Sequence, residues 1–264
     1  MAERWLVALD VDGTVLHEDG SLDEEIVRAV GEARDRGHEV TLATGRSWAT
    51  TQPVLERLGI EPAFVVCANG ALTLGLGDDG AYERVHVEVF DPTAVLERIR
   101  GHLPNGKFMV ELPDGFRLYT AGMQDWNLDD AREVPFAELL GVDATRVVVI
   151  SPDHEIEEFL GLVEGMGLHQ VSYAIGWTAW LDIAPDGVSK ATALERVRDR
   201  LGIPSELVLV AGDGRNDLEM LHWAGSTGRA VAMGQAPAEV RAAATEVAGT
   251  VGEAGLAPVL DTLP

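Results

Sequence analysis

The stretch Trp5-Leu6-Val7-Ala8-Leu9-Asp10-Val11-Asp12-Gly13-Thr14 decides the fold of this chain. Its first half is a run of five apolar residues, which is typical of a short strand buried on both faces. Two aspartates, a glycine and a threonine follow at once, so the strand ends in a polar loop that begins at Asp10. The segments that follow indicate which kind of sheet this strand joins.

Helical and strand-like segments alternate after this first strand. Ser21-Leu22-Asp23-Glu24 fits a capping box and predicts a helix that runs to about Arg36 and ends at Gly37. The next segments are a strand at 39–43, a helix at about 47–58 and a strand at 64–68. Alternation returns after Pro185, with helices at 190–201, 216–223 and 236–244 and strands at 207–211 and 230–233. The pattern predicts a Rossmann-like, doubly wound α/β core, in which helices cover both faces of a parallel sheet.

The middle of the chain has a different pattern. Two hairpins are predicted, one from 108–112 and 116–120 and the other from 169–174 and 178–184. Helices are predicted at 91–102 and 152–166, the second with Ser151 as its N-cap, and a strand at 147–150. Residues 75–80 are expected to form a turn-rich loop. The sequence therefore predicts an α+β domain, residues 83–184, inserted into an α/β core made of residues 1–82 and 185–264.

The composition is that of a soluble globular protein with an acidic surface. The 264 residues include 44 acidic and 20 basic side chains, which gives a formal net charge of -24. Such a surface repels nucleic acid and anionic membranes, so we expect neither as a partner. We expect no signal peptide, because Met1-Ala2-Glu3-Arg4 leads directly into the first strand, and no apolar run reaches the ~18–20 residues of a membrane span. A cytoplasmic protein is expected, either a monomer or a small homo-oligomer.

Polar residues follow the carboxyl ends of four predicted strands. Ligands of open parallel sheets bind at this edge. The residues in question are Asp10 and Asp12, Thr44-Gly45-Arg46, Asn69-Gly70, and Asp213-Gly214-Arg215-Asn216-Asp217. We expect all of them to converge on one crevice.

Four aspartates in one crevice would repel one another unless a cation lies between them. Carboxylate oxygens suit Mg²⁺, which is therefore the expected cofactor. Lys190, at the start of a predicted helix, would attract an anion, and Thr44 with the helix that follows it would add hydroxyl and amide donors. A metal, an ammonium group and amides around carboxylates predict a phosphoryl-transfer site in which a carboxylate attacks phosphorus.

The same residues resemble the motifs of a known family. Four segments resemble, in the family's order, the four motifs of the haloacid dehalogenase (HAD) superfamily phosphatases: Asp10-Val11-Asp12-Gly13-Thr14, Thr44-Gly45-Arg46, Gly187-Val188-Ser189-Lys190 and Gly212-Asp213-Gly214-Arg215-Asn216-Asp217. The insert resembles the larger, C2B-like cap of the Cof-type subfamily. Ala68-Asn69-Gly70-Ala71 and Ala232-Met233-Gly234-Gln235-Ala236 resemble subfamily landmarks, although similar sequences usually have Asn at the position of Gln235. The resemblance covers nearly the whole chain.

The resemblance implies a role for each motif. Asp10 would attack phosphorus and form an aspartyl-phosphate, while Asp12 would protonate the leaving oxygen and then activate water. The implied Mg²⁺ ligands are the Asp10 carboxylate, the Asp12 carbonyl and Asp213, with Asp217 acting through water. The implied phosphate-binding residues are Thr44, Gly45, Arg46, Lys190 and Asn216. For Arg46, the role of partner to a nearby carboxylate stays open beside that of substrate contact.

The function implied by the resemblance is Mg²⁺-dependent hydrolysis of small phosphate esters, such as sugar or sugar-acid phosphates, under a cap that closes over the crevice. A phosphomutase or phosphotransferase, in which a sugar hydroxyl takes the phosphoryl group, is the alternative within the superfamily. The resemblance favours hydrolysis, because this cap occurs mostly in phosphatases. A non-enzymatic signalling receiver also gathers carboxylates, a threonine and a lysine around Mg²⁺, but receivers are compact domains without a large insert.

Candidate specificity residues lie in the insert. On its last predicted strand, Trp177, Ala179, Leu181 and Ile183 share one face, and Thr178, Trp180 and Asp182 share the other. If the first face is core, then Trp180 and Asp182 are the residues available to a substrate. His169 and Arg117, which are expected on the surface, are further candidates.

Overall fold

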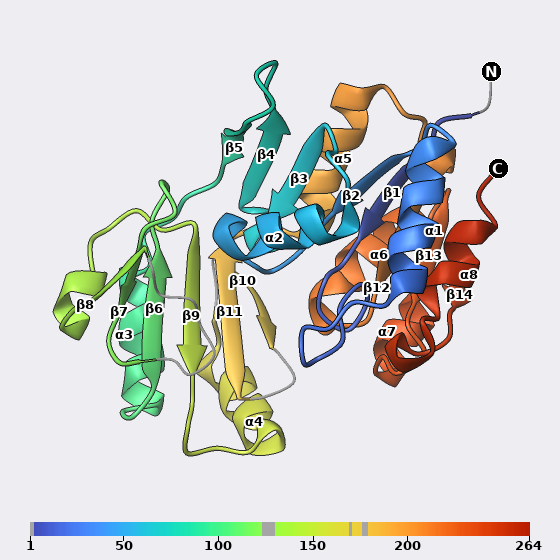
Figure 1. Ribbon diagram of the computed structural model, residues 1–264. Helices are drawn as coiled ribbons and strands as arrows, with labels where there is room; N and C mark the ends of the chain where they lie inside the picture. The colour runs from blue at the N-terminus through green and yellow to red at the C-terminus, as the bar shows by residue number, and fades with distance from the viewer. Residues whose placement is uncertain (1–2, 123–129, 169–170, 176–178) are drawn as a thin grey trace. The chain divides into compact units, whose positions relative to one another are not determined.

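The computed structural model divides into two compact units (Figure 1). Residues 1–86 and 189–264 form the core unit, and residues 87–188 form the insert unit. The junctions expected from the sequence, near Tyr82 and Pro185, lie a few residues earlier in each case. The structure describes residues 3–122, 130–168, 171–175 and 179–264.

A five-stranded parallel sheet forms the centre of the core unit. Its order is β14-β13-β12-β1-β2. All four residues of β1 are fully buried, as expected for a central strand of a covered parallel sheet. The strands are β1 (Leu6–Leu9), β2 (Glu39–Leu42), β12 (Val208–Gly212), β13 (Arg229–Ala232) and β14 (Glu246–Val247).

Helices cover this sheet. Leu194, Met220 and Val240, on α5, α6 and α7, pack with Leu6 and Ala8 of β1 in one apolar cluster. Helices α1 and α8 pack against each other on the other face (Figure 1). The arrangement confirms the predicted doubly wound core. The helices are α1 (Glu24–Asp35), α2 (Trp48–Leu58), α5 (Lys190–Leu201), α6 (Leu218–Gly225), α7 (Ala238–Ala243) and α8 (Leu256–Asp261).

The third predicted strand belongs to a different sheet. Strand β3 (Phe64–Cys67) pairs antiparallel with β4 (Leu72–Leu76), and these two form a three-stranded sheet with β5 (Tyr82–Val87). A parallel bridge between Ala43 and Val66, with a hydrogen bond from the Thr44 amide to the Val66 carbonyl, aligns β3 with the chain that follows β2. The expected loop at 75–80 is mostly the turn between β4 and β5, where the Gly77 amide donates to the Ala81 carbonyl.

The insert unit contains a six-stranded sheet of order β10-β11-β9-β6-β7-β8 with two helices. Both predicted hairpins are present, as β6–β7 and β10–β11. Leu96 of α3 and Phe159 of α4 pack with Val149, Leu181 and Ile183 in one apolar cluster, which is the core of this unit. Its elements are α3 (Thr93–His102), β6 (Lys107–Glu111), β7 (Arg117–Tyr119), β8 (Ala131–Glu133), β9 (Arg146–Ile150), α4 (Ile156–Met166), β10 (Val171–Ile175) and β11 (Trp180–Pro185).

Two predicted helix starts are wrong. The capping box at 21–24 does not form, because α1 begins at Glu24 with Asp23, not Ser21, as its N-cap, and the Asp23 carboxylate lies 2.9 Å from His17 Nε2. Helix α4 begins after Glu155 rather than at Pro152, and the Ser151 hydroxyl lies 2.6 Å from His154 Nδ1. In both cases a polar side chain binds a nearby histidine in place of the helix amides. Among the described residues, no helix has the length and apolar character that crossing a bilayer requires.

Candidate active site

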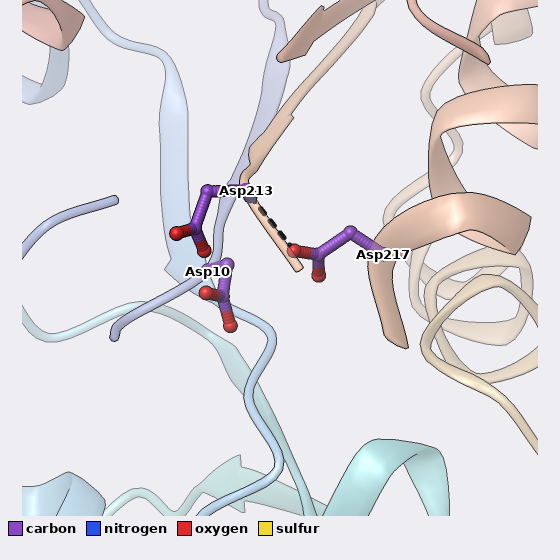
Figure 2. Close-up of side chains that lie close together, drawn as sticks. All are labelled: Asp10, Asp213 and Asp217. Carbon is purple, nitrogen blue, oxygen red and sulfur yellow. Dashed lines mark hydrogen bonds between the residues drawn. The ribbon is translucent and has the colours of Figure 1, made fainter. Parts of the chain in front are cut away.

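Three buried aspartates meet at the carboxyl edge of the core sheet. Asp10 directly follows β1, Asp213 directly follows β12, and Asp217 ends the short 3-10 turn before α6. Figure 2 shows the three side chains directed toward one another, and one carboxylate oxygen from each lies within 4.8 Å of the others. All three are less than 5% exposed. Parallel strands bring their carboxyl ends to the same edge, so residues about 200 positions apart in the sequence become neighbours.

Lys190 binds two of these aspartates. Its ammonium nitrogen lies 2.5 Å from Asp10 Oδ1 and 2.6 Å from Asp217 Oδ1, and the whole side chain is buried. Lys190 is the first residue of α5, and a capping box between Ser189 and Thr192 fixes the start of that helix. The local sequence therefore determines where the ammonium group enters the site.

Asp217 is held by three donors. Its Oδ2 atom accepts hydrogen bonds from the main-chain amides of Asp213 and Gly214, both at 2.9 Å, and its Oδ1 atom accepts from Lys190 (Figure 2 draws the first of these bonds). Because both oxygens already have protein donors, Asp217 fixes the loop after β12 and orients Lys190.

The charges in this cluster shift one another's protonation. Burial, and then repulsion from Asp217, raises the pKa of the Asp10 carboxyl well above its ordinary value. The same two causes raise the pKa of Asp213 to about 7. Burial alone would lower the pKa of Lys190, but the carboxylates of Asp10 and Asp217 raise it above its ordinary value. Among the described residues, Lys190 supplies an ammonium group that contacts two of the three buried carboxylates.

The donor set fits a divalent cation. Three carboxylates and one ammonium group leave a net charge of about -2 when all are ionised, which one Mg²⁺ ion would neutralise. Gly13 brings the loop after β1 close to this position, because a Cβ atom at Gly13 would overlap the Asp213 carboxylate. The residues present therefore fit a hard, oxygen-ligated ion.

Asp12 and Arg46 form a pair beside this cluster. Arg46 Nε lies 2.8 Å from Asp12 Oδ2, and a terminal guanidinium nitrogen lies 2.5 Å from Oδ1. The Asp12 side chain is 56% exposed, in contrast to the buried Asp10. Of the two roles left open for Arg46, the structure shows the partner of a carboxylate, in the two-pronged geometry for which a guanidinium is suited.

The loop after β2 is fastened to the loop after β3. Thr44 is fully buried, its hydroxyl accepts a hydrogen bond from the Arg46 amide at 3.1 Å, and its carbonyl accepts one from the Asn69 amide at 3.0 Å. The Asn216 side chain in turn donates to Asn69 Oδ1 at 3.1 Å. Gly45 lies half-buried between Thr44 and Arg46. The expected phosphate-binding residues thus lie on connected loops.

Two further residues lie at this edge: Asn69, which was expected there without an assigned role, and Gln235, which was not among the residues expected in the crevice. Asn69 contacts Asn216, and Gln235 donates to Asp213 Oδ2 at 3.2 Å. Both follow the carboxyl end of a strand, β3 and β13 respectively. The strand-end rule that selected Asp10, Asn69 and Asp213 could have found Gln235 too.

The predicted specificity residues belong to the insert unit. Ala179, Leu181 and Ile183 lie in its core, as expected, whereas Trp180 packs with Met109 and Val148 in a separate cluster. Asp182 forms a buried, two-pronged ion pair with Arg146, with both distances 2.8 Å.

The surface position expected for Arg117 is wrong. This residue is only 3% exposed, because β7 places it opposite Glu111 of β6, within the sheet. His169, Trp177 and Thr178 lie outside the described residues.

Known proteins match this chain over nearly its full length. A family model described as haloacid dehalogenase-like hydrolase matches residues 7–260. A Bacillus subtilis protein, 5-amino-6-(5-phospho-D-ribitylamino)uracil phosphatase YitU, is 28% identical over 97% of this chain and 96% of its own length. The Escherichia coli pyridoxal phosphate phosphatase YbhA is 27% identical over 92% of this chain and 93% of its own length.

Solved structures show the same fold. A HAD subclass IIB sugar phosphatase superposes with a TM-score of 0.79 at 19% identity, covering 97% of this chain and 98% of its own. A haloacid dehalogenase-like hydrolase from B. subtilis superposes with a TM-score of 0.78 at 23% identity, covering 98% and 99%. The family match over residues 7–260 and this shared fold agree, and the chain belongs to the haloacid dehalogenase-like hydrolases.

Proposed function

We propose that this protein is a Mg²⁺-dependent phosphatase that hydrolyses small phosphorylated metabolites through an aspartyl-phosphate on Asp10. The observation that carries the proposal is the cluster of Asp10, Asp213, Asp217 and Lys190 at one sheet edge, with Asp12 two residues after Asp10. Its relatives YitU and YbhA are named as phosphatases of small phosphorylated molecules, which supports this substrate class.

In this mechanism Asp10 is the nucleophile. Lys190 donates to the Oδ1 atom of Asp10 and so limits the rotation of the carboxylate, which keeps the nucleophile in one orientation. As an Asp10 oxygen bonds to phosphorus, the bond from phosphorus to the ester oxygen breaks, and Asp12 gives that oxygen a proton. Asp12 then takes a proton from a water molecule that attacks the same phosphorus, which releases inorganic phosphate and restores Asp10.

The residues that would hold Mg²⁺ are the carboxylates of Asp10 and Asp213 and the main-chain carbonyl of Asp12. Asp217 would act through water, because its two oxygens already accept bonds from protein donors. When bound, the ion supplies positive charge that offsets the charge of the phosphoryl group. Thr44, Gly45, Lys190 and Asn216 would hold the phosphoryl oxygens, in a reaction that depends mainly on positioning and charge.

Sugar or sugar-alcohol phosphates are the substrates that we favour. The printed name of the relative YitU contains a phosphorylated ribityl chain, which supports that choice. Trp180 would contribute an aromatic surface for the organic part of such a substrate, and we assign it to specificity on that ground. A panel of sugar, sugar-acid and sugar-alcohol phosphates, compared with nucleotides, would test the preference.

The proposed chemistry can be tested with para-nitrophenyl phosphate. We expect phosphate release that requires Mg²⁺, stops with EDTA and falls by about 10³-fold or more in Asp10→Asn, because removal of a nucleophile disables the whole pathway. Asp35→Asn, the same change at an exposed position of α1, should leave turnover unchanged. Unchanged turnover in Asp10→Asn would rule out the mechanism. Transfer of the phosphoryl group to an added sugar instead of water would identify a phosphotransferase.

A further inference from the structure

Gln235 connects three separate segments at the edge of the core sheet. It follows β13, in the loop before α7. Its side-chain nitrogen lies 2.5 Å from the Gly13 carbonyl oxygen and 3.2 Å from Asp213 Oδ2, and its side-chain oxygen accepts a hydrogen bond from the Val251 amide at 3.0 Å. A primary amide has two N–H donors and a carbonyl oxygen that accepts. In Gln235 both N–H groups have an acceptor and the oxygen has a donor.

Asp213 depends on this contact more than its neighbours do. Asp10 is held by Lys190, and Asp217 is held by Lys190 and two main-chain amides. Within the part of the chain that the structure describes, Gln235 is the only residue that donates a hydrogen bond to the Asp213 carboxylate. The rotation of that carboxylate about its Cβ–Cγ bond is therefore restricted by one glutamine.

The two donors of Gln235 act on neighbouring atoms. The bond to the Gly13 carbonyl holds the loop after β1, and the loop lies so close that a Cβ atom at Gly13 would overlap Asp213. The bond to Val251 anchors the other end of the amide in the short 3-10 turn at Val251–Glu253. Gln235 is thus fixed at both ends and cannot follow Asp213 if that carboxylate turns.

We propose that Gln235 is a positioning residue for the metal, which orients the Asp213 carboxylate toward the ion that it shares with Asp10. The proposal rests on the proposed metal-dependent function and goes beyond it, because Gln235 itself contacts neither ion nor substrate. Outer contacts of this kind, lost by mutation, typically lower metal affinity about 10- to 100-fold.

The test is direct titration of the purified, metal-free protein with Mn²⁺, followed by the paramagnetic resonance signal of the free ion. Gln235→Met keeps the length of the side chain and removes its hydrogen bonds. We expect its dissociation constant for Mn²⁺ to rise about 10- to 100-fold. Gln52→Met, the same change at an exposed glutamine of α2 whose amide donates to Glu56, is the matched control, and it should bind Mn²⁺ like the wild type.

A double variant separates this role from a general loss of structure. In Asp213→Asn, the further change Gln235→Met should cost no additional Mn²⁺ affinity, since the carboxylate through which Gln235 acts is gone. If Gln235→Met lowered the Mn²⁺ affinity by the same factor in Asp213→Asn as in the wild type, the proposal would be overturned. Should Gln235→Met not fold, Gln235→Leu also removes the hydrogen bond to Asp213, with a shorter apolar side chain. Wild-type Mn²⁺ affinity in Gln235→Leu would then overturn the proposal.

The outcomes distinguish this inference from the proposed function. Wild-type Mn²⁺ affinity in Gln235→Met, beside a wild-type enzyme that binds Mn²⁺ and hydrolyses phosphate esters, refutes the role of Gln235 and leaves the phosphatase intact. A wild-type protein that binds no Mn²⁺ and needs no metal refutes both.

Discussion

Asp12 and Arg46 show how one side chain can prepare another. The guanidinium contacts both oxygens of the Asp12 carboxylate, which is otherwise exposed and free to rotate. A general acid acts only when its proton is directed at the leaving oxygen. We therefore expect Arg46 to affect turnover through the orientation of Asp12.

Replacement of Arg46 should affect phosphate esters unequally. Para-nitrophenolate leaves without a proton, whereas an alkoxide needs one from Asp12. For Arg46→Lys, which keeps the charge and loses the two-pronged contact, we expect kcat/KM to fall about 10- to 100-fold for an alkyl phosphate and less than about 5-fold for para-nitrophenyl phosphate. Arg57→Lys, at an exposed arginine of α2, is the control. Equal losses with both esters would contradict a role through Asp12.

Single residues at the strand ends could be predicted from sequence, because each stands directly after an apolar run. The sequence placed Asp10, Thr44 and Asp213 at one sheet edge, where the structure also has them. Gln235 was not selected, since it does not directly follow its strand and its three partners, Gly13, Asp213 and Val251, are far from it in the sequence. Contacts of this kind depend on the folded backbone.

Among the elements, the turn at Ala68–Gly70 bears the most backbone strain in the core unit. Ala68 and Asn69 adopt φ angles of 49° and 50°, a left-handed conformation that costs residues with a side chain about 1–2 kcal/mol each. The turn brings the Asn69 side chain to Asn216 and the Gly70 backbone against the Ser189 carbonyl, next to Lys190. The strain is tolerated because the turn joins the loops of the site.

Two glycines with similar backbone angles should respond differently to alanine. Gly70 has a φ of 101° and a Cβ atom there would overlap the Ser189 backbone, whereas Gly80 has a φ of 80° with open space around it. We expect Gly80→Ala to lower the free energy of unfolding by about 1–2 kcal/mol, from backbone conformation alone. Gly70→Ala should lower the free energy of unfolding by a further ~1–3 kcal/mol, because of overpacking, and it should also reduce turnover. Urea denaturation measures the free energy of unfolding of both variants, and equal losses in the two would contradict the close approach of Gly70 to Ser189.

The strands of the parallel sheet were easier to predict from the sequence than those of the three-stranded sheet. The longer strands of the parallel sheet are mostly apolar and end in polar loops, so β1, β2, β12 and β13 were all predicted. Strands β4 and β5 were not predicted, because the alternation of strands and helices stops after β3 and the segment 75–80 between them was interpreted as a turn-rich loop. Very short strands such as β8 and β14 have too few residues to show a periodic pattern. Their existence depends on pairing with a neighbour, which sequence alone does not reveal.

At the scale of the whole molecule, negative charge opposes compactness. The chain carries 44 acidic and 20 basic residues, so repulsion over its surface adds to the repulsion among the buried aspartates. Salt screens the repulsion between surface charges well, because these charges face solvent, and it screens the repulsion among the buried aspartates poorly. A divalent ion bound in the site would reduce the repulsion among the buried aspartates.

Salt and magnesium should therefore stabilise the protein separately. We expect the thermal midpoint of the metal-free protein to rise as NaCl increases from about 10 mM to about 0.5 M, through screening. At constant ionic strength, millimolar Mg²⁺ should raise it further by binding the folded state. Asp213→Asn should abolish the response to Mg²⁺ and keep the response to NaCl. If the variant still responded fully to Mg²⁺, the ion would be acting on the surface.

The core unit is assembled from the two ends of the chain, and this has a consequence for its biosynthesis. Strand β1 lies between β2 and β12, and about 200 residues separate Leu9 from Val208. At roughly 5–20 residues per second, a ribosome that has made β1 needs a further 10–40 seconds or so to make its second neighbour. Throughout that interval one edge of β1 lacks the neighbour that it has in the folded core, and Asp213 and Asp217 have not yet been made. The cluster of aspartates can therefore assemble only after β12 has emerged, and a translational pause within the insert lengthens the time for which that edge of β1 is unpaired.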